Sequence, residues 1–576
     1  MKFKIPFIDY LLIISIWLLI FGKKCLSNFM LVDYIPSTHL DIKFNLLNTG
    51  YTHIFSLFDL FKIILAPFSL FNLMFTLSIL ISMLVSYFYI RRTFKEKGLI
   101  FCLLFAFIYF FNPFVYSRIM IGQLSVLISY ILMPVFIFYV YEFLKNPDSK
   151  QLIKLVISMT LVSLFSIHFF LLNFIILIVV LFWSYISNDK TPYSNTPSLI
   201  KSIKLIIIFL ILLTLLNSFW LQGFFSIKIL STIDSSHEEF FSPRMSENIP
   251  AIAKISGMWG FWRESSYFTT YNSLPIYVWY SMLLMLLLLM ITSYFSSNSD
   301  NKSKTFFTLF WVGMLLGAGI SHPYTKPFFD FLFNYLPLFN GLRDSHKLVS
   351  FVCLAYAYFI PLLVVNIKNN LKSNVKQQSK ANSSSILLIL LIISVIVFFL
   401  TYTYPLINLH NQLQPLSYPK SYNQIDSYLN SQNVNGYVVY LPWQTYLTYS
   451  WTIGSSSDGR ISVPARVFQD HVIGGPDKYG AEDEISLQIS SCINQKSVQC
   501  FEKANVQYIL KDKCAIYPDK YEFLNQTPLY QSDCIDVYKL NNENKIEYSM
   551  PLRFIIGVLI SIITLIVMVY LLVRKR

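Results

Sequence analysis

Long apolar blocks alternate with short polar segments over residues 1–404, and one more apolar block lies close to the C-terminal end. A helix needs about 20 predominantly apolar residues to cross the hydrocarbon core of a bilayer. Twelve blocks approach this length, at residues 5–22, 62–90, 98–112, 123–144, 152–166, 168–187, 203–221, 274–295, 305–320, 348–366, 385–404 and 552–573. The pattern predicts an all-α polytopic membrane protein with about twelve transmembrane helices.

Two regions of this pattern are irregular. The stretch 152–187 is too long for one helix and barely long enough for two, so we expect a turn at Ser166-Ile167-His168. The block 305–320 is short and rich in glycine, which predicts a tilted or broken helix. Irregular backbone at that depth has to be covered by protein rather than by lipid.

A long polar segment, residues 405–550, separates the last two apolar blocks. Strand-like runs at 437–443, 506–510 and 535–540 and helix-like runs at 422–429 and 481–492 predict a small α/β domain. The expected organisation is therefore a helical bundle at 1–404, an α/β domain at 405–550, and a last helix with a basic tail at 551–576.

Composition and charge agree with a membrane protein. The chain has 576 residues, of which 55% are hydrophobic and only 13% charged, about half the charged fraction that is usual in soluble proteins. Lys and Arg, which give a net charge of +14, gather in alternate loops, as the positive-inside rule describes. We therefore expect a multi-pass cell-membrane protein with both termini cytoplasmic. Nucleic-acid binding is not supported, because topology explains the charge.

This orientation places five segments outside the cell, and these hold the candidate chemistry. They are residues 23–61, 113–122, 222–273, 321–347 and the domain 405–550. Four of the seven cysteines lie in that domain: Cys492, Cys500, Cys514 and Cys534. An even set in an oxidising compartment predicts one or two disulfides, with four free thiols as the alternative. No CxxC pair is present, so a zinc site is not expected.

Two acidic residues in the first outer loop are candidate catalytic groups, Asp33 and Asp41. A carboxylate close to the membrane surface can take a proton from a sugar hydroxyl or orient an acceptor. The alternative is an ordinary solvated loop acid, although Asp33 lies in an apolar setting beside Pro36. With His39 these residues also offer ligands for a divalent cation, which the sequence leaves open as a cofactor.

Three cations near the outer ends of predicted spans are candidate phosphate ligands. Arg118 follows Asn112-Pro113-Phe114-Val115-Tyr116-Ser117, and Arg343 and Lys347 enter the tenth span. A guanidinium at bilayer-edge depth suits a lipid phosphate. Headgroup anchoring by interfacial cations is the competing interpretation.

A third set of residues suits a sugar ring. Trp262, Arg263 and Glu264 combine an aromatic platform with a charge pair, and His168 stands at the outer end of a span. The same residues also fit an aromatic belt with a local ion pair and a helix-end hydrogen bond. Phosphate-loop, HExxH and GxSxG motifs are absent from the sequence.

Taken together, the chain resembles the GT-C superfamily of polytopic membrane glycosyltransferases. It is particularly similar to archaeal and bacterial members related to YfhO-like proteins and to mycobacterial arabinofuranosyltransferases. The segments that carry the resemblance are Asp33 in the first outer loop, the stretch Asn112 to Arg118 with Gly122-Gln123, the stretch Phe339 to Lys347, and Tyr437 to Trp443 with Val537-Tyr538 in the soluble domain.

The resemblance implies a transfer of sugar from a polyprenyl-phosphate-type lipid donor to a glycan or glycoprotein acceptor on the extracytoplasmic face. Asp33 would take a proton from the acceptor hydroxyl or orient it, and Arg118 with Arg343 would neutralise the departing phosphate. The chain departs from better-known members because no adjacent acidic pair stands in the first loop, and the WWDxG signature of oligosaccharyltransferases is missing. Two alternatives stay open: a non-catalytic scaffold of the same fold, and a transporter or flippase of lipid-linked glycans.

Overall fold

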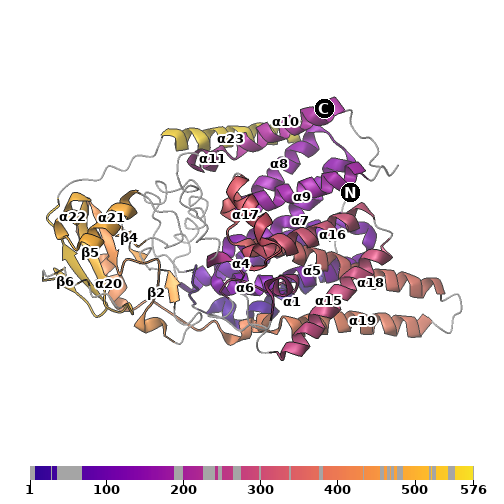
Figure 1. Cartoon of the computed structure of the whole chain (residues 1–576), viewed down its shortest axis with the longest axis horizontal. Helices are drawn as coiled ribbons and strands as arrows, with labels where there is room; N and C mark the ends of the chain where they lie inside the picture. The colour runs from indigo at the N-terminus through magenta and orange to yellow at the C-terminus, as the bar shows by residue number, and fades with distance from the viewer. Residues whose placement is uncertain are drawn as a thin grey trace.

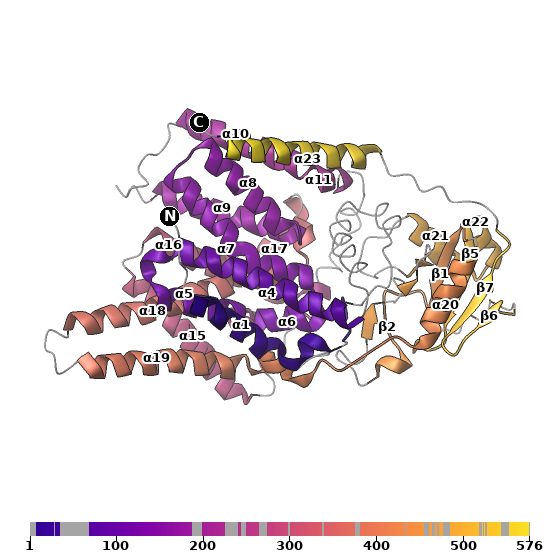
Figure 2. The same cartoon turned by 180° about the vertical axis from the view of Figure 1, so that it is seen from behind.

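The computed structural model of the chain describes residues 7–27, 29–34, 68–186, 199–224, 240–243, 249–263, 274–297, 300–336, 339–374, 381–432, 434–453, 460–462, 467–468, 472–475, 484–517, 521, 524, 527–542 and 552–574. A bundle of long helices forms most of this part, and a smaller unit built on a β-sheet lies at one end of the bundle (Figures 1 and 2). We call the smaller unit, residues 412–542, the sheet domain.

Seven helices among the described residues are long and apolar enough to cross a membrane. They are α4 (Phe68–Thr93), α7 (Leu124–Lys145), α9 (Ile167–Ile186), α15 (Ile276–Ser296), α18 (Val349–Asn374), α19 (Ala381–Tyr402) and α23 (Leu552–Val573). A bent pair, α5 (Leu99–Phe110) and α6 (Pro113–Ile121), would make an eighth span. The chain is thus a multi-pass membrane protein.

The remaining predicted spans also coincide with helices, which are α1 (Phe7–Phe21), α8 (Ser149–Ser163), α10 (Leu199–Leu216) and α16 (Asn301–Gly317). The turn expected near residue 166 separates α8 from α9. These four helices do not meet the length and hydropathy requirement for a span. Twelve crossings are therefore not confirmed.

Helix α18 lies at the centre of the bundle and packs against α5, α15 and α16. The glycines of the 305–320 block explain how closely α16 approaches it. A Cβ atom added at Gly313 would lie 2.8 Å from the carbonyl oxygen of Leu348 and 2.9 Å from Cβ of Phe351. The glycine-rich block is thus an intact helix as far as Gly317, and the missing side chain at Gly313 serves close helix packing.

Short helices connect these long ones. They are α11 (Ser218–Phe224), α13 (Ala251–Ser256) and α17 (Lys326–Tyr335), with 3-10 turns at Gly22–Leu26, Lys95–Lys97, Gly319–Ser321, Phe339–Leu342, Ser345–Leu348 and Tyr404–Asn411. The last helix, α23, returns from the sheet domain and packs along α10 and α11 (Figure 1). Hydroxyls of Ser218 and Ser561 lie 3.0 Å apart at this contact.

The sheet domain has a five-stranded sheet in the order β4-β1-β5-β7-β6. Its strands are β4 (Val472–Ile473), β1 (Tyr437–Leu441), β5 (Val506–Asp512), β7 (Ile535–Lys539) and β6 (Tyr530–Gln531). The pairs β4-β1 and β1-β5 are parallel, and the pairs β5-β7 and β7-β6 are antiparallel. Helices α20 (Lys420–Ser431), α21 (Glu484–Gln495) and α22 (Val498–Lys503) complete the unit.

Strand β1 is buried on both faces, as expected for a strand whose residues are all apolar or aromatic. Val438 and Tyr440 belong to one hydrophobic cluster, whereas Tyr437, Val439 and Leu441 belong to a second one. Successive side chains of a strand point to opposite faces, so one strand supplies both clusters. Strands β1, β5 and β7 are those that the sequence predicted, and β4 and β6 are too short to be recognised from a pattern.

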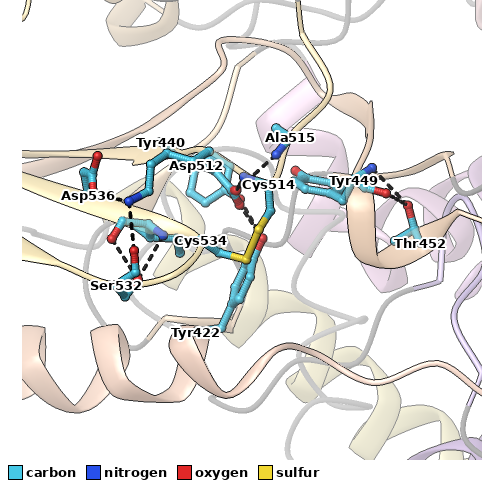
Figure 3. Close-up of a disulfide and its surroundings, with 12 residues drawn as sticks. Tyr422, Tyr440, Tyr449, Thr452, Asp512, Cys514, Ala515, Ser532, Cys534 and Asp536 are labelled. Carbon is cyan, nitrogen blue, oxygen red and sulfur yellow. Dashed lines mark hydrogen bonds and ion pairs between the residues drawn. A yellow bond between two sulfur atoms is a disulfide. The ribbon is translucent and has the colours of Figure 1, made fainter.

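A separate two-stranded hairpin joins β2 (Tyr446–Thr448) and β3 (Arg460–Ser462), and it lies on the side of the sheet domain that faces the bundle (Figures 1 and 2). The structure pairs the four cysteines of this domain as Cys492–Cys500 and Cys514–Cys534. The second disulfide links the end of β5 to the start of β7 (Figure 3).

The carboxyl group of Asp512 lies beside this disulfide, buried in the domain (Figure 3). It accepts hydrogen bonds from the hydroxyls of Tyr422 and Tyr440 and from the backbone N–H groups of Cys514 (2.8 Å) and Ala515 (3.2 Å). Burial raises the pKa of the Asp512 carboxyl even though all four donors act to lower it. The cluster fixes the segment after β5.

Residues 29–34 join the bundle to the sheet domain. Phe29 and Leu31 are buried in the bundle core, whereas Met30 between them is buried in a core cluster of the sheet domain. Nearby, the Lys24 ammonium donates to the carbonyl oxygen of Leu413 over 2.7 Å. Three consecutive side chains therefore alternate between the two units.

The orientation in the membrane is the first prediction. Asn369→Cys, on the exposed end of α18, should react only with a membrane-permeant thiol reagent, whereas Gln488→Cys, on the exposed face of α21, should also react with an impermeant one. The expectation follows from the basic residues of the loop after α18. Labelling in intact cells measures it, and the reverse pattern would invert the orientation.

Candidate functional site

The site begins where α5 ends, at a helix cap formed by Asn112. Its side-chain oxygen accepts from the backbone N–H of Val115 (3.1 Å), and its amide donates to the hydroxyl of Tyr130 (3.0 Å). Asparagine is a favoured cap because its side chain satisfies a backbone donor that the helix cannot. Pro113 follows at the first helical position, where its missing N–H costs nothing. Helix α6 thus starts at a fixed point, and all nine of its residues are buried.

Gly122 ends α6 and contacts the loop that carries Asp33. Its φ is +86°, a left-handed conformation in which glycine is favoured. A Cβ atom there would lie 2.7 Å from Cβ of Tyr34 and 2.9 Å from Cβ of Leu31. The backbone N–H of Asp33 donates to the carbonyl of Ile121 over 2.8 Å. The first outer loop is therefore held directly against the end of α6.

Gln123, the next residue, connects the two principal candidates. Its side-chain oxygen accepts from Nη1 of Arg118, and its Nε2 donates to Oδ2 of Asp33 over 3.3 Å. An uncharged amide can do this because it has one accepting and one donating end. A carboxylate and a guanidinium are thus linked in one hydrogen-bonded chain.

Arg118 is fully buried and is neutralised by a residue far away in sequence. Its Nη1 lies 2.9 Å from Oδ2 of Asp344, and Nζ of Lys347 lies 3.0 Å from the same oxygen. Nη2 of Arg118 is 2.9 Å from Nδ1 of His346. Within the described part of the chain, Nε of Arg118 is buried without a hydrogen-bond partner.

Two cations thus share one anion in this cluster. Burial alone would raise the pKa of the Asp344 carboxyl, but the charges of Arg118 and Lys347 hold that pKa well below its usual range. Asp344 is therefore ionised, and the triad of Arg118, Asp344 and Lys347 carries an excess positive charge. Aromatic rings limit access to it, because the Arg118 guanidinium lies 4.6 Å from the ring centre of Phe261 and 5.1 Å from that of Phe114.

The sheet domain adds one residue to this site. The hydroxyl of Tyr446, from β2, donates to Oδ1 of Asp33 over 2.9 Å. The guanidinium of Arg263 lies 4.9 Å from the Tyr446 ring and 4.2 Å from the Trp262 ring. Cations attract aromatic faces in this range. An aromatic and cationic wall therefore stands beside Asp33.

Most of the residues predicted from the sequence meet here. Asp33, Arg118 and Lys347 are joined through Gln123 and Asp344, and Trp262 with Arg263 lies beside Tyr446. Arg343 is partly exposed, with its guanidinium 5.2 Å from the ring of Phe241. Arg118 is covered by protein together with every other residue of α6, so the alternative in which its side chain extends to lipid headgroups is not observed.

His168 has a more distant relation to the cluster. It opens α9, and its Nδ1 lies 3.2 Å from the hydroxyl of Ser166. The charged side chains of Lys347, Arg343 and Asp344 interact electrostatically with its imidazole ring. The helix-end hydrogen bond that the sequence offered as the alternative is therefore present. Asp41 and Glu264 fall outside the described residues, so their roles stay predictions.

Four residues of the site received no role from the sequence: Gln123, Asp344, His346 and Tyr446. The first three stood inside quoted segments, and an acid beside Arg343 at the mouth of a span was the available signal for Asp344. No local pattern pointed to Tyr446, which is 413 positions from its partner Asp33.

The geometry does not favour a metal at Asp33. Both carboxylate oxygens accept hydrogen bonds, from Gln123 and Tyr446, and a cation bound there would face these donor groups. Among the residues that the structure describes, no group of three His, Cys, Asp or Glu side chains could hold a metal ion. His39 and Asp41, the other two candidate ligands, fall outside the described residues, so the divalent cation stays a prediction.

No protein-family model matches the sequence. No curated protein matches it either. Two similar solved structures are cryo-electron microscopy structures of the arabinofuranosyltransferase AftD from Mycobacteria. The first has a TM-score of 0.57 and 10% sequence identity, and the match covers 93% of this chain and 40% of that one. The second, the R1389S mutant of the same protein, has a TM-score of 0.52 and 12% identity, with 93% and 41% covered.

At this identity the comparison shows the fold alone: this chain is folded like the matched part of that protein. This chain spans less than half the length of the protein that it matches. The fold similarity nevertheless extends over nearly all of the present chain, bundle and sheet domain together.

The buried ion pair generates the second prediction. Asp344→Asn leaves Arg118 and Lys347 without their shared counter-charge, and removal of one partner from a buried pair costs about 3–5 kcal/mol. The midpoint of thermal unfolding in detergent should therefore fall clearly. The matched control is Asp330→Asn, whose partner Lys326 is 3.8 Å away and half exposed, and which should cost at most about 1 kcal/mol. Equal midpoints for the two variants would contradict the prediction.

Proposed function

We propose that the chain is a membrane glycosyltransferase that moves a sugar from a polyprenyl-phosphate-type lipid donor to a hydroxyl of a glycan or glycoprotein acceptor on the extracytoplasmic face. The observation that supports this most directly is the bridge from Asp33 through Gln123 to Arg118. In this proposal Asp33 is the base and Arg118 the anion-binding group, and transfer from a sugar phosphate requires both functions.

The reaction needs one proton transfer and one displacement. Asp33 takes the proton of the acceptor hydroxyl, and the acceptor oxygen forms a bond to the anomeric carbon of the donor sugar. The bond from that carbon to the phosphate oxygen breaks, and its electron pair stays on the lipid phosphate. Arg118 and Lys347 stabilise the negative charge that develops on the phosphate, a contribution that is often the largest in catalysis.

The phosphate would have to share its cations with Asp344. Arg118 and Lys347 both contact one oxygen of that residue, and the excess positive charge of the triad favours a second anion. Arg343, which is partly exposed and directly precedes Asp344 in sequence, adds a further cation. The donor site proposed here is therefore cationic even with Asp344 ionised.

The same ion pair supports a second candidate, a non-catalytic scaffold of the same fold. In that case Asp344 would serve as the permanent counter-ion of Arg118, and no phosphate would enter. The two candidates differ in the expected result of substituting Asp33 or Arg118. In a transferase, sugar transfer should fall even when the protein stays folded, whereas in a scaffold only the stability should change.

The third prediction concerns Asp33. Asp33→Asn keeps the side-chain shape and removes the base, which contributes about 10²–10⁴-fold in comparable enzymes. Sugar transfer should fall by at least about a hundredfold, measured in membranes with radiolabelled polyprenyl-phosphate arabinofuranose and then with hexose donors. Asp41→Asn serves as the control and should have a much smaller effect. Normal transfer by both variants would favour the scaffold.

The fourth prediction concerns Arg118. Arg118→Lys replaces a planar fork that reaches Gln123, Asp344 and His346 by a single point charge. The KM for the lipid donor should rise about tenfold, equivalent to ~1.4 kcal/mol of binding, while the KM for the acceptor stays the same. Steady-state kinetics on purified protein measure both constants. An unchanged donor KM in a folded Arg118→Lys protein would remove Arg118 from the donor site.

A further inference from the structure

Tyr446 is the one described side chain of the sheet domain that hydrogen-bonds to Asp33, and its position follows from the hairpin that carries it. In β2, Leu447 is buried in a core cluster of the sheet domain. Adjacent side chains of a strand point to opposite faces, so Tyr446 points away from that core and joins a small cluster with Val32, Ile121 and Trp262 of the bundle. The hairpin therefore presents this tyrosine to the bundle.

The hairpin is anchored firmly to the rest of the domain. The N–H of Ile516 donates to the carbonyl of Thr448, and the N–H of Ser450 donates to the carbonyl of Cys514, each over 2.8 Å. Cys514 is bound to Cys534, and Asp512 accepts from the N–H of Cys514 (Figure 3). Since the disulfide, the carboxylate and β2 form one connected unit, the position of Tyr446 is set by the sheet domain.

Asp33 is consequently held from two sides. Gln123 of the bundle donates to Oδ2, and Tyr446 of the sheet domain donates to Oδ1. One donor on each carboxylate oxygen, from two different units of the chain, fixes the orientation of the carboxylate. The Asp33 side chain is still partly exposed, which is what a group that must meet an acceptor requires.

We propose that Tyr446 is a positioning residue of the transferase site, which orients Asp33 toward the acceptor hydroxyl and makes the sheet domain one wall of the acceptor site. This inference rests on the proposed function. Its ligand is a hydroxyl group of a saccharide that approaches from the aqueous side, because that wall belongs to the soluble part of the chain. The rings of Trp262 and Tyr446, with Arg263 against both, offer the aromatic and cationic surface that suits a sugar.

The closing experiment compares Tyr446→Phe with Tyr446→Ala in purified full-length protein. Phenylalanine keeps the ring that packs on Arg263 and Trp262 and removes only the hydroxyl. With polyprenyl-phosphate arabinofuranose as donor and a short oligosaccharide as acceptor, Tyr446→Phe should lower kcat about tenfold to a hundredfold, as expected for a lost hydrogen bond to a charged group. The donor KM should not change, in contrast to Arg118→Lys.

The matched control is Tyr530→Phe. The Tyr530 ring stacks on Tyr428 at the far edge of the sheet, so this substitution should leave all kinetic constants at their normal values.

A second readout does not depend on activity. Met30 is 1% exposed and lies in a core cluster of the sheet domain, so Met30→Cys in a Cys25→Ser background reports whether the domain is docked. Its maleimide reactivity should stay low in Tyr446→Phe.

Three outcomes would overturn the proposal. Normal kinetics in Tyr446→Phe with an inactive Asp33→Asn would remove Tyr446 alone and leave the proposed function standing. Normal transfer by Asp33→Asn would overturn the proposed function and the inference with it. A loss of activity in Tyr446→Phe that is accompanied by fast labelling of Met30→Cys would show that the hydroxyl only docks the domain, contrary to a positioning role.

Discussion

The completely buried guanidinium of Arg118 imposes the strongest constraint on this structure. A buried charge is tolerated only when it is paired and hydrogen-bonded, and Arg118 obtains two of its three partners from a distant part of the chain. Asp344 and His346 come from the segment before α18, and Gln123 comes from the end of α6. Because the guanidinium is planar and its donors have fixed directions, the end of α6 and the entry of α18 are fixed relative to each other.

That constraint extends to Asp33 through two short-range contacts. Gly122 lets the first outer loop lie against the end of α6, and Ile121 accepts the backbone N–H of Asp33. The carboxylate therefore stands at a set distance from the cationic triad, although no direct ion pair joins them. A separation of this kind suits two groups that act on two ends of one reaction, because a direct pair would neutralise both.

Much of the fold could be predicted from the sequence. The apolar blocks coincide with helices because a bundle buried in lipid requires continuous apolar surface. The apolar run at 437–441 indicated a strand, and both faces of that strand are buried in the structure. Asp33, Arg118 and Trp262 were also singled out in the sequence, the two charged residues because ionisable side chains are unusual beside apolar segments.

The pairing of these residues could not be predicted. Arg118 and Asp344 are 226 positions apart, and Asp33 and Tyr446 are 413 positions apart, so no local period connects them. Burial was misjudged for the same reason. The sequence left open an Arg118 side chain that extends to lipid headgroups, but α6 is enclosed by other parts of the protein that only the tertiary structure brings there. The number of membrane crossings likewise depends on how short helices tilt and pack, which hydropathy does not record.

The junction at residues 29–34 explains why bundle and sheet domain act on the site together. Phe29 and Leu31 are fixed in the bundle core, and Met30 between them is fixed in the sheet domain. Asp33 is only three residues beyond Met30, and an extended chain spans at most about 3.6 Å per residue. A displacement of the sheet domain would thus pull on the loop of Asp33 and also withdraw Tyr446 from its carboxylate. Since both effects act on the same side chain, separation of the sheet domain from the bundle would disturb the geometry of the base.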